Sequence, residues 1–175
     1  MSKKQNKVAK RLFGIVLSII LMSGISFSVH NEFIKDKDAS NNEEMAFIKE
    51  GELMFLRAIS GDTLKVIDIE VADNEHKRSQ GLMYRSSMPE YFGMLFIFDN
   101  EEPLTFWMKD TYIPLDILFV NDSLEIVSIS ENCKPMVKWP IKSEKPAKYV
   151  VEVNAGYVYQ WGVKAGDKIQ FLRLQ

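Results

Sequence analysis

The stretch that decides the expected fold is PLDILFVNDSLEIVSI, residues 114–129. Two runs rich in β-branched and aromatic residues, 115–120 and 124–129, stand on either side of Asn121-Asp122-Ser123. Short polar residues of this kind form tight turns between antiparallel strands. Pro114 precedes the first run and forces Ile113 into extended backbone. The stretch therefore predicts a β-hairpin.

Strand patterns continue before and after this hairpin, while helical patterns are short. The further predicted strands are residues 53–59, 63–71, 93–98, 104–109, 148–153 and 167–174. Two short helices are predicted over residues 74–80 and 155–161, with Asp73 and Asn154 as N-caps and Gly81 and Gly162 as stops. Strands and helices do not alternate regularly. The fold class is therefore mainly β: a single small sandwich or barrel with two short helices.

The composition excludes several classes of protein. The 175 residues suffice for one domain, and the net charge of −2 argues against a nucleic-acid partner. A single cysteine, Cys133, excludes an intrachain disulfide and a cysteine-rich zinc site, and two histidines argue against a histidine site. The chain has no phosphate-binding loop, dinucleotide glycine motif or serine-nucleophile elbow. We therefore expect no metal and no cofactor.

The first 28 residues have the form of an export signal. Residues 1–11 carry five basic residues and no acidic one, and residues 12–28 are apolar. Ser26 and Ser28 suit the small positions before a cleavage point, and the alternative is an uncleaved membrane anchor. We expect an exported protein, either periplasmic, extracellular or membrane-tethered, that meets the membrane only through this segment.

A linker and a domain are expected after the signal. Residues 29–51 are polar and mixed in charge, which predicts a linker, and residues 52–175 are expected to form the β domain. The alternative for the end of the linker is packing on the domain, which Met45, Phe47 and Ile48 favour.

One face of the predicted strand 104–109 has binding chemistry. In an extended strand Trp107 and Lys109 share a face, and such a pair can stack on a sugar ring or hold an anion. Arg85 follows the first helix beside apolar neighbours, where its guanidinium can hold a carboxylate or phosphate. The structural alternative for Arg85 is an internal ion pair with a strand aspartate.

Two aspartates lie on either side of the bend at Pro114. Asp116 stands in an apolar run, so it must pair, accept several hydrogen bonds, or be held for use; Asp110 can approach it. Two close carboxylates can act as acid and base when their pKa values differ, and structural ion pairing is the alternative. Asn154 and the two small residues after it begin the second helix, where backbone N–H groups can bind an anion or simply be capped.

Several short motifs occur in one order and resemble a known family. They span about Val66 to Phe171 and are Gly81-Leu82-Met83 with Arg85, Gly93-Met94-Leu95-Phe96 with Phe98, Phe106-Trp107-Met108-Lys109, Pro114-Leu115-Asp116-Ile117, Val127 with Ile129, Glu152 with Asn154-Ala155-Gly156, and Gly162 with Gly166-Asp167. With these motifs the chain resembles the domain of unknown function family number 192 of bacteria and archaea. The resemblance implies a mostly β, jelly-roll-like domain, often behind an export signal, and it implies no activity. The family usually has asparagine where this chain has Asp110, which adds a charge beside Asp116.

The residues favour a binding function. We expect an exported domain that binds a small polar or anionic ligand, such as an envelope saccharide. The candidate site residues would form the contact surface or orient polar groups, and they are Arg85, Trp107, Lys109, Asp110, Asp116 and Asn154. Two alternatives stay open: a hydrolase or lyase that uses Asp110 and Asp116, and a structural or partner-binding cell-envelope protein.

Overall fold

The hairpin predicted at residues 114–129 is present at one edge of the main sheet. In the computed structural model, which describes residues 46–174, β5 (Leu115–Val120) pairs antiparallel with β6 (Ile126–Cys133). Asn121 closes the loop between them. Its N–H donates to the Glu125 carbonyl, and its side-chain oxygen accepts from the Glu125 N–H, both at 2.9 Å. The polar turn residues therefore act as the sequence predicts.

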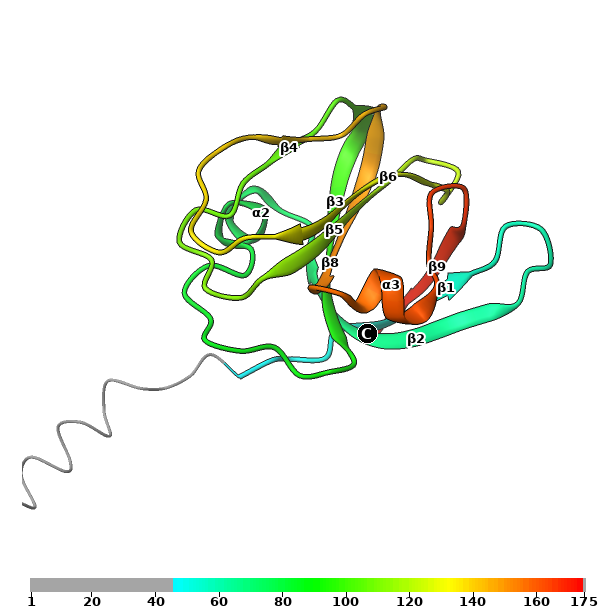
Figure 1. The fold of residues 1–175 in the computed structure, drawn as a ribbon, viewed down its shortest axis with the longest axis horizontal. Coiled ribbons are helices and arrows are strands. Elements are labelled where there is room, and N and C mark those ends of the chain that lie inside the picture. Colours follow the sequence, from blue (N-terminus) through cyan, green and yellow to red (C-terminus); the bar gives the residue numbers. More distant parts are fainter. Residues whose placement is uncertain (1–45, 175) are drawn as a thin grey trace, which may run out of the picture. The chain divides into compact units, whose positions relative to one another are not determined.

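The other strands of the described chain join this sheet or a two-stranded sheet beside it (Figure 1). They are β1 (Gly51–Leu56), β2 (Thr63–Ala72), β3 (Phe92–Glu102), β4 (Thr105–Phe106), β7 (Ile141–Lys142), β8 (Ala147–Asn154) and β9 (Lys168–Arg173). The main sheet has the order β6-β5-β8-β3-β2-β1-β9, and the small sheet pairs β4 with β7. The β2–β3 pair is parallel, so the chain between these strands must cross over, and it contains helix α2 (Glu75–Gln80).

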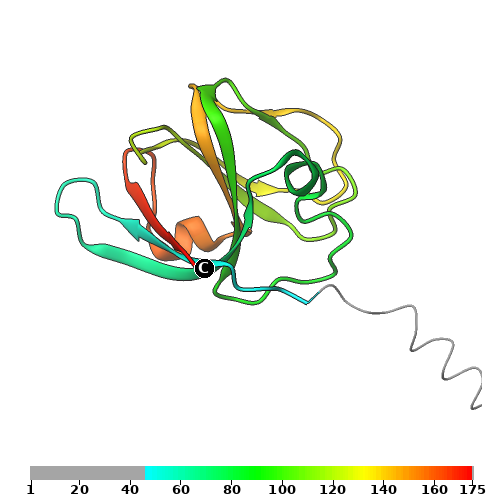
Figure 2. The same cartoon turned by 180° about the vertical axis from the view of Figure 1, so that it is seen from behind.

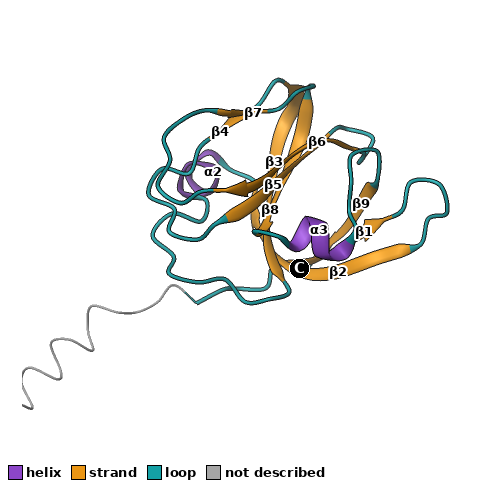
Figure 3. Cartoon of the chain, viewed as in Figure 1, coloured by secondary structure: helices purple, strands orange, loops and turns teal. Residues whose placement is uncertain are grey.

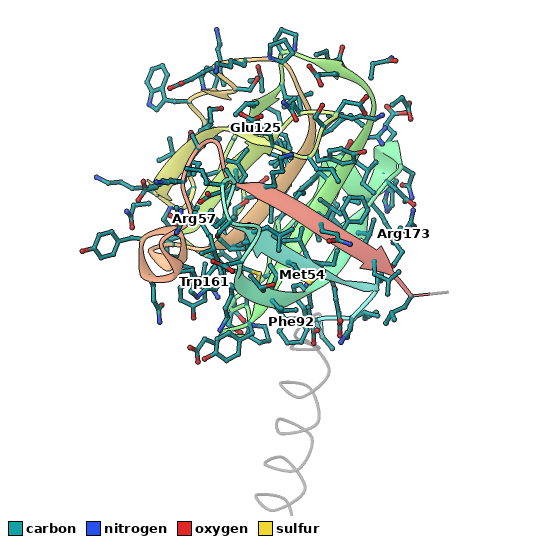
Figure 4. All side chains as sticks on the ribbon, turned by 90° about the vertical axis from the view of Figure 1, so that its right-hand side faces the viewer. Met54, Arg57, Phe92, Glu125, Trp161 and Arg173 are labelled. Carbon is teal, nitrogen blue, oxygen red and sulfur yellow. The ribbon has the colours of Figure 1, made fainter. Side chains whose placement is uncertain are left out.

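The main sheet curls until its two edge strands meet. One isolated bridge joins Glu125, just before β6, to Lys168 of β9, and the Ile126 N–H donates to the Asp167 carbonyl at 2.8 Å. In Figure 4, β9 runs across this side of the molecule from near Glu125 to Arg173. The edges do not pair along their length, so the barrel is not closed. The predicted class, mainly β with two short helices, is confirmed.

Both faces of the curled sheet are buried, and each face contributes to a separate hydrophobic core. The inner face forms a core that includes Leu53, Leu118 and Val158 of helix α3 (Tyr157–Trp161). The outer face forms a second core that includes Phe96 and Met108, beneath α2 and the loops near it (Figures 2 and 3). Each large apolar side chain buried in this way contributes roughly 1.5–3 kcal/mol.

The register of the sheet places two glutamates in one row on the outer face. Glu70 of β2 lies beside Met94 of β3, and Met94 lies beside Glu152 of β8. Both glutamate side chains are buried. Adjacent strands are about 4.8 Å apart, so the backbones at Glu70 and Glu152 are separated by roughly 10 Å.

Helix α2 begins and ends on local signals, although its cap is not the predicted one. The Asn74 side chain accepts a hydrogen bond from the Lys77 N–H at 3.0 Å, which makes Asn74 the N-cap. Asp73 instead forms an ion pair with Arg173 at 2.7 Å, so its prediction as the cap is wrong. Gly81 ends the helix at φ 49°, as predicted, because glycine adopts left-handed backbone at little cost.

The predicted strand 104–109 is wrong after Phe106. Its partner β7 offers only two paired residues and follows Pro140, which cannot donate to a β-ladder. The chain turns instead, and Asp110 has a φ of 54°. Trp107 and Lys109 therefore do not share the face of a strand.

The end of the predicted linker packs on the domain. The Phe47 and Phe92 rings meet edge to face at 4.6 Å, and the Ile48 N–H donates to Glu70 at 2.8 Å. Residues 46–50 thus follow the alternative that the sequence left open. The predicted signal segment and residues 29–45 lie outside the described residues. No helix within residues 46–174 has the length and apolar character needed to cross a membrane.

Candidate functional site

A groove lies between α2 and the segment that contains β4, on the outer side of the sheet. Its volume is about 340 Å³, and its lining residues are Glu75, Arg78, Ser79, Phe98, Thr105, Phe106 and Trp107. We call it the α2–β4 groove. A smaller hollow of about 40 Å³, the inner pocket, shares Arg78, Ser79, Phe106 and Trp107 with it and therefore adjoins it. The inner pocket is completed by Gln80, Gly81, Leu82, Met83, Phe96, Thr111 and Glu152.

Aromatic rings form one wall of the groove. Phe106 is fixed by edge-to-face contacts with Phe96 at 5.0 Å and with Phe119 at 5.9 Å. Trp107 follows it and is 52% exposed. An exposed indole beside an anchored ring offers a flat apolar surface with a polar N–H at its edge. This wall can stack on a ring-shaped polar ligand.

Glu152 lines the inner pocket, where its carboxyl is buried. It is 5% exposed, and no lysine or arginine of the described chain forms an ion pair with it. Burial raises the pKa of the Glu152 carboxyl from 4.5 to about 8. Glu152 therefore carries a proton at neutral pH and can donate a hydrogen bond.

Glu152 is not among the site residues predicted from the sequence. A signal was present, because Glu152 is the one charged residue in the apolar run Tyr149–Val153. The same signal marks Asp116 in its own run, so the pattern identifies a buried carboxyl without its role.

Arg78 is the cation of the groove, and it already has partners. Its Nη1 donates to the Ile97 carbonyl at 2.9 Å, and its guanidinium carbon lies 5.2 Å from the centroid of the Phe98 ring. Glu75 lines the same groove and carries the opposite charge. The groove is therefore polar and aromatic without an excess of positive charge.

Arg85 lies outside the groove. It is buried, and its Nη2 forms an ion pair with Glu70 Oε2 at 2.5 Å. Its guanidinium carbon lies 5.2 Å from the Phe47 ring centroid. Arg85 lines a separate hollow with Lys77, so the structure does not bring Arg85 and Trp107 together. The sequence alternative of an internal ion pair describes its state, with glutamate as the partner rather than aspartate.

Lys109 and Asp110 lie beside the groove without lining it. The Lys109 ammonium is 3.9 Å from Asp110 Oδ2 and 5.5 Å from the centroid of the Trp107 ring. The Tyr84 hydroxyl donates to Asp110 at 3.2 Å, and the charge of Asp110 raises the pKa of Tyr84. Asparagine and aspartate both tolerate the positive φ found at position 110. This shared tolerance explains how Asp110 can stand where the family usually has asparagine.

Asp116 has a structural role that the sequence left open. It is fully buried, and its carboxylate accepts the N–H groups of Asn132 at 2.8 Å, Gly156 at 2.9 Å and Val158 at 3.1 Å. The carboxylate thus caps helix α3, where the sequence allowed an anion to bind.

Asn154 does not cap helix α3 as predicted, because Asp116 does so. Its side-chain amide donates to the carbonyls of Met88 at 3.0 Å and Pro89 at 3.3 Å, which ties down the loop before β3. Asp110 and Asp116 bind different partners, and Asp116 is sealed from solvent. The structure therefore does not present these two aspartates as an acid–base pair.

The described part of the chain holds no group of three or more histidine, cysteine, aspartate or glutamate side chains placed to hold a metal ion. Cys133 is partly buried, and this burial raises the pKa of its thiol to about 11. The thiol therefore stays protonated and unreactive at neutral pH.

Fold and groove together define a small, mainly β domain with a hollow of about 340 Å³ on the outer face of a curled mixed sheet. The chain belongs to the family DUF192, described as "Uncharacterized ACR", whose family model matches residues 56–171. The resemblance seen in the sequence motifs is thereby confirmed.

Related proteins support this assignment. The chain is 30% identical over 110 residues to the UPF0127 protein PF1050 of Pyrococcus furiosus, which covers 62% of this chain and 90% of the relative. A crystal structure from Sinorhizobium meliloti 1021, described as that of a candidate transcription regulator, is 38% identical in sequence, with a TM-score of 0.67. The match covers 73% of this chain and 97% of the chain in that crystal structure. The crystal structure of a protein of unknown function from Novosphingobium aromaticivorans is 32% identical in sequence, with a TM-score of 0.64. The match covers 68% of this chain and 83% of that protein's chain.

Proposed function

We propose that this domain binds a small, neutral, polyhydroxylated ligand, such as an envelope saccharide, in the α2–β4 groove. One observation carries the proposal: an exposed indole, Trp107, and a buried carboxyl, Glu152, line adjoining hollows on one side of the sheet. Saccharides combine an apolar ring face with hydroxyl groups, and these two side chains match those two features.

The charges of the groove favour a neutral ligand over an anion. The anionic alternative needs Arg85 and Lys109, but neither side chain lines the groove. Arg78 already donates to a backbone carbonyl. An anion in the groove would also lie near the carboxylate of Glu75, which repels it.

The size of the groove fits a ligand of one or two sugar rings. Its volume of about 340 Å³ lies at the lower end of the range for sites of small molecules, roughly 300–1,000 Å³. The inner pocket adds room for a single hydroxyl group or a water molecule beside Glu152.

Calorimetric titration tests the proposal with glucose, maltose and N,N′-diacetylchitobiose as neutral probes and sodium sulfate as the anionic one. At least one saccharide is expected to bind, and Trp107→Ala should weaken that binding about tenfold or more, equivalent to about 1.4 kcal/mol. Trp139→Ala is the matched control, since it removes another exposed indole that does not line the groove.

Two results would overturn this function. Equal affinity of the Trp107→Ala protein and the unchanged protein for a bound saccharide would place the site elsewhere. Binding of sulfate alone, with no saccharide bound at millimolar concentration, would show that the ligand is an anion.

A further inference from the structure

A second stretch of the chain, whose residues do not line the groove, is rich in positive charge. Residues 134–148, here called the lysine-rich loop, contain five lysines and one glutamate in a chain whose net charge is −2. Four of these lysines are exposed and form no ion pair with any described residue: Lys134, Lys138, Lys142 and Lys145. Lys148 pairs with Asp122 and is not one of these four.

The same loop also exposes large apolar side chains to solvent. Trp139 is 79% exposed, and Met136 is about half exposed. The backbone that bears them is fixed, because the Met136 N–H donates to the Thr111 carbonyl at 3.1 Å and the Val137 carbonyl accepts the Met108 N–H at 3.0 Å. Exposure of these side chains is therefore a property of an anchored loop.

We propose that the lysine-rich loop docks the domain on an anionic lipid surface, with Trp139 and Met136 in the headgroup region and the lysines on lipid phosphates. This inference is independent of the groove and its ligand, and it adds a membrane contact to the N-terminal segment, which the sequence alone led us to expect as the single one. Tryptophan between lysines is the composition that favours the membrane–water interface. Protein–protein interfaces, in contrast, are enriched in tryptophan and methionine but depleted in lysine.

The sequence before the described residues also bears on the partner. Residues 134–140 lie away from the turn between β1 and β2 (Figures 1 and 2). The apolar segment 12–28 precedes the described residues by 17 residues, 29–45. A chain of that length spans at most roughly 60 Å, so a membrane-inserted segment would hold the domain within reach of the bilayer.

Nitroxide labelling of the full chain in vesicles tests the proposal. A label is placed at position 139 in a Trp139→Cys, Cys133→Ser protein, and a second label at position 59 in an Ile59→Cys, Cys133→Ser protein. Ile59 is 99% exposed on the β1–β2 turn, which makes it the matched site that should stay in water. Vesicles contain phosphatidylcholine alone or with phosphatidylglycerol, and collisions with a water-soluble nickel complex are measured.

In vesicles with phosphatidylglycerol, the label at 139 is expected to lose at least half of its nickel collisions, and the label at 59 none. High salt and the double variant Lys138→Glu, Lys142→Glu should restore the collisions. Lys164→Glu with Lys168→Glu is the matched control, because it changes the net charge equally at exposed lysines outside the loop. It should leave docking intact.

Three outcomes would overturn the proposal. One is no loss of nickel collisions at position 139 in vesicles that contain phosphatidylglycerol. Another is equal protection in both kinds of vesicle that salt does not change, which would show apolar insertion without lipid charge. The third is protection without vesicles, which would show contact between copies of the protein.

Discussion

The buried carboxyl of Glu152 makes the stability of this protein depend on pH in a direction that can be calculated. The perturbation is Glu152→Gln, which keeps the shape of the side chain and removes its titration. In the folded chain the pKa of Glu152 is raised by burial to about 8, against 4.5 without burial. Between these values the folded state holds one more proton than the unfolded state, so the free energy of unfolding falls as the pH rises.

The magnitude follows from the gap between the two pKa values. Each unit of pH costs about 1.4 kcal/mol within the window, and the window covers between three and four units. The contribution of Glu152 is therefore fully present below pH 4.5 and decreases by up to roughly 5 kcal/mol as the pH approaches 8. The Glu152→Gln protein cannot lose this contribution.

Urea denaturation of both proteins at several values between pH 4.5 and 9 measures the effect. The free energy of unfolding of the variant, relative to the unchanged protein, should rise steadily to pH 8 and then level off. Any fixed effect of the amide shifts the whole difference curve and leaves its slope unchanged. Glu131→Gln is the matched control, since Glu131 is exposed on β6 and should change stability by less than about 0.5 kcal/mol at every pH.

Parallel stability curves for the two proteins would refute the reasoning. They would show that Glu152 releases its proton at the same pH in the folded and unfolded chains. The carboxyl would then be charged at neutral pH and would serve the groove as an acceptor only.

Further predictions concern three other acidic side chains that make specific contacts. Asp116→Asn should lower the free energy of unfolding, measured in urea, by roughly 2–4 kcal/mol because charge-assisted hydrogen bonds to three N–H groups are lost; a change below about 0.5 kcal/mol would contradict its capping role. Arg85→Met and Glu70→Gln should each lower the free energy of unfolding by about 3–5 kcal/mol, and the double variant should recover at least half of the summed loss. Strictly additive losses in this double-mutant cycle would disprove an energetic coupling between Arg85 and Glu70. Asp110→Asn should change thermal stability little, while Asp110→Val should cost about 1–2 kcal/mol at a positive φ; similar effects of the two changes would show that backbone conformation does not select this residue.

Local patterns were sufficient for the fold class and for most elements. The hairpin at 114–129 follows from two β-rich runs around Asn121, and the Asn121 side chain makes the turn contact that its chemistry allows. Gly81 and Gly162 end their helices at positive φ as predicted. These features depend on neighbours in the sequence, so they can be read before any tertiary contact is known.

The candidate site was less predictable, because strand alternation holds only while a strand has a partner. Trp107 and Lys109 were placed together on a strand that in fact ends at Phe106. The length of that strand depends on β7, a segment more than 30 residues later in the chain. No local pattern in the sequence shows how many residues of β7 pair with β4.

The amino-acid sequence by itself determined that this chain forms a small, mainly β domain and that Asp116 lies in an apolar run, where it must be paired or hydrogen-bonded. Tertiary structure alone decided the surroundings of Asp116 and of two further buried acids. Glu70 forms an ion pair with Arg85, and Asp116 accepts hydrogen bonds from the start of a helix 40 residues away. Glu152 forms no ion pair with a cation among the described residues. The physical reason is that a carboxyl's charge depends on its desolvation and its hydrogen-bond donors, which distant segments supply.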